Sequence, residues 1–468
     1  MTMHLYDSHS QSLRPFEELK TGEVGIYLCG PTVQGAPHVG HLRSALVYDQ
    51  LRRWLQAKGK NVTMVRNVTD IDDKVLENAK ITGEPWWALA YRFELEFNAA
   101  YRALGIEPPT YEPRATASIP EMLELIDRLI ANGYAYQAED GSADVYFAAS
   151  KWANYGELTN QKIDDMDSAE DGDLRGKRDA RDFTLWKAHK ESEPASAAWS
   201  TRFGLGRPGW HIECSAMSTK YLGSKFDIHG GGLDLRFPHH ENELAQSRAA
   251  GDEFANFWLH NGLVNVEGRK MSKSLGNSIF AGDLLAAGSP LAVRYYLGSA
   301  QYRSTLDYHD GVLTEAQTAI ERIATFMQRA QALVGNVEAG YQSLPADFIN
   351  GMDDDLNIPV ALGALHLAVR NGNAAIDAGE IGAVSSALSQ VASMVDVLGI
   401  NPTASQWQSA GAGAATDALS AIVDGLLEQR QAARAAKDFA KSDEIRDLLQ
   451  RAGITLEDGA NETKWSIN

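Results

Sequence analysis

The chain has 468 residues, of which 44% are hydrophobic and 22% charged, so we expect more than one globular domain. Its net charge of −19 excludes a protein that is basic throughout, but a local basic surface for nucleic acid stays possible. No apolar run is long enough for a membrane span, and no signal-peptide core precedes the first domain. With only two cysteines, we expect a cytoplasmic protein without a disulfide.

The N-terminal part is predicted to form strand, helix and strand. The apolar run 24–28 predicts a buried strand, and a turn rich in glycine and proline follows it. A helix is predicted from about residue 40 to 58, where Gly59 ends it. Its apolar positions are Leu42, Leu46, Leu51, Trp54 and Leu55. The β-branched segment 61–70 predicts a second strand, and this succession is the unit of parallel α/β sheets.

The middle of the chain predicts an insertion within that sheet domain. A helix is expected within 115–135, followed by a polar, irregular stretch at 137–200 with short candidate strands such as ADVYF. Sheet-like segments resume over 205–265, where we expect strands in GWHIECSAM, KFDIHGGG and NGLVNVEG. The insertion should therefore split one parallel sheet domain into two halves.

From about residue 310 onward the pattern is helical. Thr314 and Gln317 have the spacing of a capping box, and 402–416, rich in small residues, predicts a linker. One helix face is predicted from Val384, Leu388, Val391, Val395 and Leu398. The C-terminal unit should contain two helices, with apolar faces formed by Leu419, Ile422, Val423, Leu426 and Leu427, and by Ile445, Leu448 and Leu449.

Two short motifs point to phosphate chemistry. In HVGH, His38 and His41 share one face at the start of a helix, where unpaired N–H groups favour an anion. In KMSKS, Lys270 and Lys273 lie on a loop suited to holding a polyphosphate. The plain alternatives are two histidines that cap a helix and two solvated lysines. Together the motifs resemble the signatures of class I aminoacyl-tRNA synthetases, in which these side chains stabilise the transition state as an amino acid attacks ATP.

A third pattern predicts a metal site. Cys29, Cys214, His239 and Glu243 offer two sulfur, one nitrogen and one oxygen donor, a plausible tetrahedral zinc set. By spacing alone, His240 could replace His239, and the plain alternative is two buried cysteines that lie far apart. A metal that binds thiolates would let a protein select cysteine over serine as a ligand far more strongly than side-chain packing would.

With NVTDIDDK (67–74), GRPGWHIECSAM (206–217), FDIHGGG (226–232) and FPHHENE (237–243), the chain resembles the cysteinyl-tRNA synthetase family over nearly its whole length. The resemblance implies a Rossmann-type catalytic domain split by an insertion, an all-α helical bundle and a small α+β anticodon-binding domain. We divide the chain accordingly into 1–125, 126–200, 201–262, 263–310, 311–402 and 416–468. These are the first catalytic half, the connective insertion, the second catalytic half, the KMSKS-containing stem-contact region, the bundle and the anticodon-binding domain.

The resemblance also implies roles for single residues. The zinc ligands would be Cys29, Cys214, His239 and Glu243, and the catalytic groups His38, His41, Lys270 and Lys273. ATP and the adenylate would lie against Gly30, Thr32, Gly40, Gly232, Asp234, Val266 and Lys273. The cysteine pocket would contain Thr69, Trp210 and His229, and the anticodon would meet Arg434, Phe439, Asp443 and Asp458.

The family assignment predicts a monomeric enzyme that uses one zinc ion per chain and ATP with Mg²⁺. It would join L-cysteine to tRNA(Cys) and release AMP and diphosphate. Two alternatives stay open at this point. One is a mycothiol-pathway cysteine ligase, which shares the catalytic half but forms an amide with an amino sugar. The other is a tRNA-binding paralogue without catalytic activity.

Overall fold

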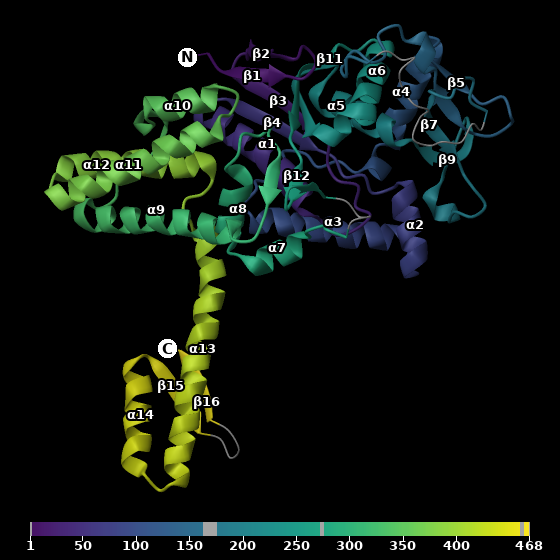
Figure 1. Cartoon of the computed structure of the whole chain (residues 1–468). Coiled ribbons are helices and arrows are strands. Elements are labelled where there is room, and N and C mark those ends of the chain that lie inside the picture. The colour runs from purple at the N-terminus through teal and green to yellow at the C-terminus, as the bar shows by residue number, and fades with distance from the viewer. Residues whose placement is uncertain (1, 162–175, 272–275, 459–462, 468) are drawn as a thin grey trace. The chain divides into compact units, whose positions relative to one another are not determined.

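A computed structural model describes residues 2–161, 176–271, 276–458 and 463–467, with side chains described except at 408–418, 457, 458, 463, 464, 466 and 467. The chain divides into two compact units, Met1–Pro402 and Thr403–Asn468. Figure 1 shows the first as a mixed α/β unit and the second as helices with a hairpin. The expected α/β fold class with a helical bundle is confirmed.

A four-stranded parallel sheet forms the centre of the first unit. Its strands, in the order β11-β10-β3-β4, are Phe254–Asn261, Lys225–Gly232, Glu23–Leu28 and Asn61–Arg66. Helix α1 (Val39–Ala57) connects β3 to β4, and α6 (Glu241–Ala249) connects β10 to β11. The chain therefore runs outward in both directions from the β3–β10 pair, which makes the carboxyl edge of that pair a topological switch point.

Helix α1 has the face that its sequence predicts. Leu42, Leu46, Leu51, Trp54 and Leu55 are all buried. The helix contacts β4 and β10, whereas α5 (Trp210–Leu222) contacts β3 and β10. Because α1 begins shortly after β3 ends, the first turn of α1 lies at the carboxyl edge of the sheet.

The segment between β4 and α5 forms helices and a second sheet. Helices α2 (Asp73–Thr82), α3 (Trp86–Ala103) and α4 (Ile119–Ala131) come first. An antiparallel sheet follows, β5-β6-β7-β9-β8, formed by Ala135–Gln137, Val145–Phe147, Phe183–Ala188, Gly204–Pro208 and Trp199–Thr201. The prediction of a strand in GWHIECSAM was wrong, because these residues form α5. Its buried residues include His211, Ile212, Glu213 and Cys214 in succession, so burial on all sides obscures the helical period.

A hairpin and a small sheet complete the α/β part of the first unit. Strands β1 (His4–Asp7) and β2 (Ser12–Pro15) pair antiparallel near the N-terminus. The sheet β13-β12-β14, from Arg269–Lys270, Val264–Val266 and Leu306–Tyr308, follows β11. Helices α7 (Ala281–Ala287) and α8 (Pro290–Gly298) lie in the chain between β13 and β14, and α8 contacts α9 of the bundle.

The bundle contains α9 (Val312–Val334), α10 (Ala346–Asp353), α11 (Ile358–Ala378) and α12 (Ile381–Leu398). The capping-box prediction at Thr314 was wrong, because α9 begins at Val312 after Gly311. The predicted face of α12 is confirmed, since Val384, Leu388, Val391, Val395 and Leu398 are all buried. Among the described residues, α12 is the one helix long and apolar enough to cross a membrane, and its contacts with α9 and α11 are those of a core helix.

A buried ion pair connects α8 to α1 and lies beside the end of α12. Arg294 of α8 donates to Asp49 of α1 at 2.5 Å, and both side chains are 1% exposed. The same guanidinium donates to the carbonyl oxygens of Leu104, Gly105 and Leu398. One side chain thus joins the ends of α3 and α12 to the middle of the helix that begins with HVGH.

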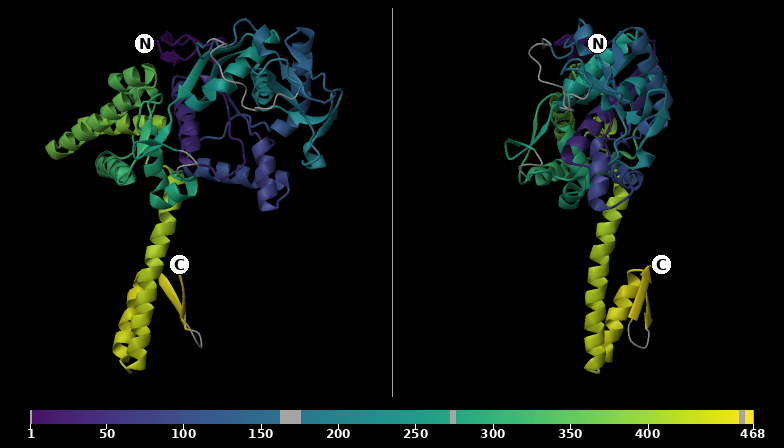
Figure 2. Two further views of the ribbon diagram at one scale, coloured as in Figure 1. Left: turned by 45° about the vertical axis from the view of Figure 1, so that its right-hand side comes forward. Right: turned by 90° about the vertical axis from the view of Figure 1, so that its right-hand side faces the viewer.

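The second unit is an α+β hairpin assembly. Helix α13 (Ser405–Ala435) packs against α14 (Phe439–Arg451), and Figure 2 shows the two side by side. Strands β15 (Ile454–Asp458) and β16 (Thr463–Ile467) pair antiparallel. The linker prediction was wrong from residue 405, where α13 begins. Ile422 and Leu448 are exposed, so those two positions of the predicted faces were also wrong, whereas Val423, Ile445 and Leu449 are buried.

Candidate active site

Several predicted site residues lie together at the carboxyl edge of the parallel sheet. Cys29 directly follows β3, and its N–H donates to the Gly230 carbonyl of β10 at 3.1 Å. Thr69 follows β4 and pairs with Thr32 in an isolated bridge. Gly232 ends β10. Since these segments leave neighbouring parallel strands at the switch point, they meet at one place although they are far apart in the sequence.

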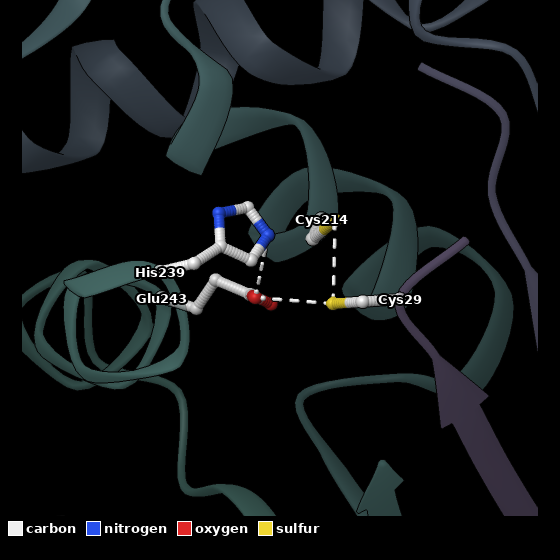
Figure 3. A group of neighbouring side chains, drawn as sticks. All are labelled: Cys29, Cys214, His239 and Glu243. Carbon is white, nitrogen blue, oxygen red and sulfur yellow. Dashed lines mark hydrogen bonds and ion pairs between the residues drawn. The ribbon is translucent and has the colours of Figure 1, made fainter. Parts of the chain in front are cut away.

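The four predicted metal ligands lie together and are fully buried (Figure 3). Cys29 follows a strand, Cys214 lies on α5, His239 lies in the kinked segment Arg236–His240, and Glu243 lies in the first turn of α6. The Sγ atoms of the two cysteines are 3.7 Å apart. Glu243 Oε1 lies 3.3 Å from Cys29 Sγ and 3.1 Å from His239 Nε2.

These distances fit a tetrahedral zinc ion. Zinc–ligand bonds of about 2.3 Å to sulfur and about 2.0–2.2 Å to nitrogen and oxygen imply donor separations of about 3.8 Å for S···S and about 3.4 Å for N···O. All four donor atoms of the cluster lie within 4.8 Å of one another. The donor set, two thiols with one imidazole and one carboxylate, also belongs to the chemistry that zinc prefers.

A second group shares two of these donors. Cys29, His229, His240 and Glu243 also lie within 4.8 Å of one another, and His229 Nε2 is 2.8 Å from Glu243 Oε2. His240 Nδ1 contacts His260 Nε2 at 2.8 Å. The geometry therefore keeps both histidines of FPHH beside the cluster, but the group with His239 brings in both cysteines.

Burial determines the protonation of the donors. Burial raises the pKa of the Cys29 thiol well above its usual value, and neighbouring Cys214 and Glu243 raise it further. The pKa of Cys214 is likewise raised by burial, and burial lowers the pKa of His239 far below its usual value. A neutral imidazole can ligate a metal, whereas the thiols need a nearby cation before they ionise.

Outer contacts orient the His239 ring. Its Nδ1 lies 3.0 Å from Nδ1 of His211, and the Trp210 ring stacks on it at a centroid distance of 4.1 Å. Gln246 donates to the His211 carbonyl at 3.0 Å. Such contacts typically fix the rotamer and tautomer of a ligating histidine. Trp210, expected in the cysteine pocket, therefore packs directly on a predicted metal ligand.

The HVGH histidines cap α1. His38 is the N-cap residue, and its Nδ1 accepts from the Gly40 N–H at 3.2 Å. His41 Nδ1 accepts from the His38 N–H at 3.2 Å, so the two rings complete a capping box and stack at 3.6 Å. Because a backbone N–H can only donate, both Nδ1 atoms act as acceptors and the ring protons lie on Nε2. His38 and His41 can therefore cap α1 through Nδ1 and also donate a hydrogen bond to a ligand through Nε2.

The segment around KMSKS lies against HVGH. The Val39 N–H donates to the Ile279 carbonyl at 2.9 Å, and Ala281 donates to Pro37 at 2.8 Å. A Cβ atom at Gly40 would make an ordinary contact with Met271 Cε at 3.8 Å and a tight one with the His38 ring at 3.1 Å, so Met271 lies close to the start of α1. Lys270 is exposed on β13. Lys273 lies outside the described residues.

A chain of hydrogen bonds runs beside the metal cluster. The Gly30 N–H donates to Asn67 Oδ1 at 2.8 Å, Asn67 Nδ2 donates to Thr69 Oγ1 at 3.3 Å, and Thr69 donates to Glu213 Oε2 at 2.8 Å. Burial raises the pKa of Glu213 well above its usual value. A Cβ atom at Gly30 would overlap the backbone carbonyl oxygen of Asn67, so only glycine lets these two backbone segments lie so close together.

The other predicted positions are distributed over both units. Asp234 lies in the turn Leu233–Leu235 after β10, and Val266 ends β12. Arg434 is exposed near the end of α13, Phe439 begins α14 and is 63% exposed, and Asp443 is exposed on α14. Asp458 ends β15, and its side chain lies outside the described ones.

Three further polar residues of the site, Asn67, His211 and Glu213, were not predicted from the sequence. Two of them adjoin predicted site residues, since Glu213 precedes Cys214 and His211 follows Trp210. A polar residue within the buried stretch HIECS was the available signal, because a buried carboxylate or imidazole needs a partner.

Comparisons with known proteins identify the family of the chain. Residues 15–318 match the family of class I (C) tRNA synthetase catalytic domains, 347–401 match the DALR domain, and 416–465 match the cysteinyl-tRNA ligase anticodon-binding domain. The cysteine–tRNA ligases of Clavibacter sepedonicus and Leifsonia xyli are each 60% identical to the chain, with 100% of both sequences covered.

Solved structures show the same fold at low identity. Mycobacterium tuberculosis methionyl-tRNA synthetase, in complex with methionyl-adenylate, is 18% identical with a TM-score of 0.58 over 81% of this chain and 90% of that one. The LeuRS of Agrobacterium radiobacter K84 is 12% identical with a TM-score of 0.58, covering 82% and 84%. With full-length relatives and three matching domains, the chain belongs to the cysteine–tRNA ligase family of class I aminoacyl-tRNA synthetases.

Proposed function

We propose that this enzyme activates L-cysteine with ATP and transfers the cysteinyl group to tRNA(Cys), with one zinc ion selecting the substrate. In the first step a cysteine carboxylate oxygen attacks the α-phosphorus, the bond to the β-phosphate breaks and diphosphate leaves. In the second step a ribose hydroxyl at the tRNA end attacks the carbonyl carbon and AMP leaves. The observation that carries the proposal is the buried cluster of Cys29, Cys214, His239 and Glu243.

The zinc ligands would be these four side chains, with His239 favoured over His240 because its group includes both cysteines. Bound zinc would supply a soft Lewis acid that attracts the substrate thiol over the hydroxyl of serine. The raised pKa values of the buried thiols mean that they ionise only beside such a cation. Trp210 and His229 line the same cluster, which supports their assignment to the cysteine pocket.

The phosphate end of the site would be held by the start of α1. His38 and His41 offer Nε2 protons there, and the helix N-terminus adds its positive dipole. Lys270 and Lys273 would meet charge that develops on the leaving diphosphate. Gly30, Thr32, Gly40, Gly232, Asp234 and Val266 would border ATP and the adenylate.

The C-terminal unit would read the anticodon. Arg434, Phe439, Asp443 and Asp458 supply the planes and polar groups that single-stranded bases need. Exposure of Phe439 at the start of α14 supports this, because an ordinary core phenylalanine would be covered. We also propose the six-segment division of the chain, a monomeric state and a cytoplasmic location.

Two assays on the purified protein test the proposal. Cysteine-dependent exchange of radiolabelled diphosphate into ATP, together with charging of tRNA(Cys), is expected with zinc near one ion per chain by elemental analysis. Exchange without tRNA charging, but with amide formation on an amino sugar, would instead identify a mycothiol-type ligase. Absence of exchange with retained tRNA binding would identify a binding paralogue, and full activity without zinc would refute the metal assignment.

A further inference from the structure

A relay of hydrogen bonds connects the neighbours of the two cysteine ligands. It starts at Gly30, which follows Cys29, passes through Asn67 and Thr69, and ends at Glu213, which precedes Cys214. Asn67, Thr69 and Glu213 are each 1% exposed. A buried carboxylate on the wall of a site, held in place by a relay, calls for a functional reason because its burial is unfavourable.

The groups that can only donate fix the direction of the first two bonds in the relay. The Gly30 N–H can only donate, so the oxygen of the Asn67 amide must face it and the NH₂ group must face Thr69. An amide NH₂ can also only donate, so Thr69 Oγ1 accepts that bond. The single hydroxyl proton of Thr69 is then directed to Glu213 Oε2 at 2.8 Å. This oxygen accepts the bond both when the carboxyl is ionised and when its proton is on Oε1.

Thr69 is therefore left with a lone pair and no proton to offer. A hydroxyl oxygen can accept two hydrogen bonds, and Asn67 uses one of them. Toward any further ligand Thr69 acts as an acceptor. A substrate ammonium group has three donors and no acceptor, whereas a substrate carboxylate has only acceptors, so Thr69 matches the amino end of an amino acid.

The position of Thr69 also fits the amino end of the substrate. If the substrate sulfur joins the cluster of Cys29 and Cys214, its ammonium group is separated from the sulfur only by the Cβ and Cα atoms. The relay ends on the residues adjoining those two cysteines. Glu213 adds an acidic group, and Asp70 and Asp72 lie close enough to act on it. A carboxyl group keeps an acceptor oxygen in either protonation state, so this wall offers acceptors to an ammonium group.

We propose that Glu213 is a positioning residue that holds the Thr69 hydroxyl as a hydrogen-bond acceptor for the α-ammonium group of cysteine. Asn67 supports it from the other side. The inference rests on the proposed function, since it assumes that cysteine is the bound amino acid. Glu213 acts through Thr69 and touches no reacting atom.

The test compares two ligands on a set of variants. The ligands are cysteine, by KM in diphosphate exchange, and 3-mercaptopropionate, a competitive inhibitor that has the thiol and carboxylate but no amino group. Glu213→Met removes the acceptor at similar side-chain length, Glu213→Gln keeps an acceptor oxygen, and Thr69→Val removes the hydroxyl. Ser218→Ala, also buried on α5, serves as the control.

Glu213→Met is expected to raise the KM for cysteine about ten- to a hundredfold, the effect of losing one hydrogen bond to a charged group. The inhibition constant of 3-mercaptopropionate, kcat and the zinc content should change little, and Glu213→Gln should restore much of the affinity. Combining Glu213→Met with Thr69→Val should cost no more than Thr69→Val alone, because the two act through one contact.

A parallel rise in the cysteine KM and the inhibitor constant would overturn the inference, because it would indicate a general distortion of the pocket. Additive effects in the double variant would overturn it as well, since Glu213 would then act independently of Thr69. Failure of the unsubstituted enzyme to catalyse cysteine-dependent exchange would instead refute the proposed function, and with it the ligand assumed here.

Discussion

The cysteines illustrate how single residues obtain their chemistry from their surroundings. Cys29 and Cys214 lie 3.7 Å apart as buried thiols, next to a carboxylate and an imidazole that face them. Isolated buried cysteines are inert, small apolar residues. Here burial raises the pKa of both thiols and the acidic neighbour Glu243 raises it further, an arrangement that is unfavourable unless a cation compensates the charge.

Cys214→Ser should therefore reduce bound zinc well below one ion per chain and raise the cysteine KM sharply, because a hydroxyl is a poor zinc ligand. Metal analysis and exchange kinetics on the same preparation check this. Ser218→Ala on the same helix is the matched control and should retain zinc. Unchanged cysteine kinetics in Cys214→Ser would contradict the idea that a metal at this site recognises the thiol.

His41 combines a structural and a proposed catalytic role at different ring atoms. His41→Ala removes both, so adenylate formation should slow by about 10²–10³, and the loss of the cap should lower stability by about 1 kcal/mol. His41→Gln is the informative partner, since glutamine at the third helical position can accept the same backbone bond. It should restore stability but leave the rate low, as single-turnover kinetics and thermal unfolding can measure. Recovery of both would assign His41 to capping alone.

At the scale of elements, α1 connects the proposed phosphate end of the site to the bundle. Its first turn carries HVGH, and Asp49 in its middle binds Arg294, which also holds the end of α12 through the Leu398 carbonyl. Burial would raise the pKa of Asp49, but the Arg294 and Arg53 guanidiniums outweigh it and lower that pKa. The ion pair thus contributes its full stabilisation of the fold above the unfolded-state Asp49 pKa of about 3.9. This stabilisation is lost as the pH falls through the lower pKa that Asp49 has in the folded protein.

Arg294→Met should destabilise the first unit by about 3–5 kcal/mol, because it leaves Asp49 and several carbonyl groups buried without that partner. Chemical denaturation at neutral pH measures the effect, and the difference from the unsubstituted protein should shrink in acid as Asp49 becomes protonated. Arg329→Met is the control, since Arg329 pairs with Asp377 on the surface and its loss should change little. Equal effects of the two substitutions would show that the buried network adds nothing.

At the scale of the whole molecule, the active-site residues belong to Met1–Pro402, and the proposed anticodon contacts to Thr403–Asn468. Substitutions in the second unit should therefore separate the two half-reactions. Phe439→Ala and Asp458→Ala are expected to reduce charging of tRNA(Cys) while cysteine-dependent exchange is retained, because stacking and base contacts occur only when tRNA binds.

Ile422→Ala provides a control for this prediction, since Ile422 is exposed on α13 to a similar extent as Phe439 but is not among the proposed contacts. Both assays on each variant, with native tRNA and with tRNA altered at the first anticodon base, identify the contact. A joint loss of exchange and charging would make the residue structural, and unchanged charging would exclude it from anticodon reading.

The sequence by itself determined the family and the parallel strand–helix–strand unit, because these depend on local patterns. It also named the candidate metal donors, although spacing left His239 and His240 as alternatives. Apolar residues such as Leu46 and Val391 recur with the helical period wherever one face of a helix is exposed. HVGH and KMSKS are each an unbroken run of residues, so each can be recognised without knowledge of the fold. The pattern failed where burial surrounds an element, as in α5, whose buried run from His211 to Ser218 hides the period. It also failed at 405–416, where small residues are compatible with both linker and helix.

Tertiary structure decided which atoms meet. Spacing could not choose between His239 and His240, since both lie within one turn of Glu243, and only packing brings His239 into the group with both cysteines. The relay from Gly30 to Glu213 is equally invisible in the sequence, because its members leave different strands and helices. Parallel sheet topology brings those ends to one edge, and the direction of each hydrogen bond then follows from which groups can donate.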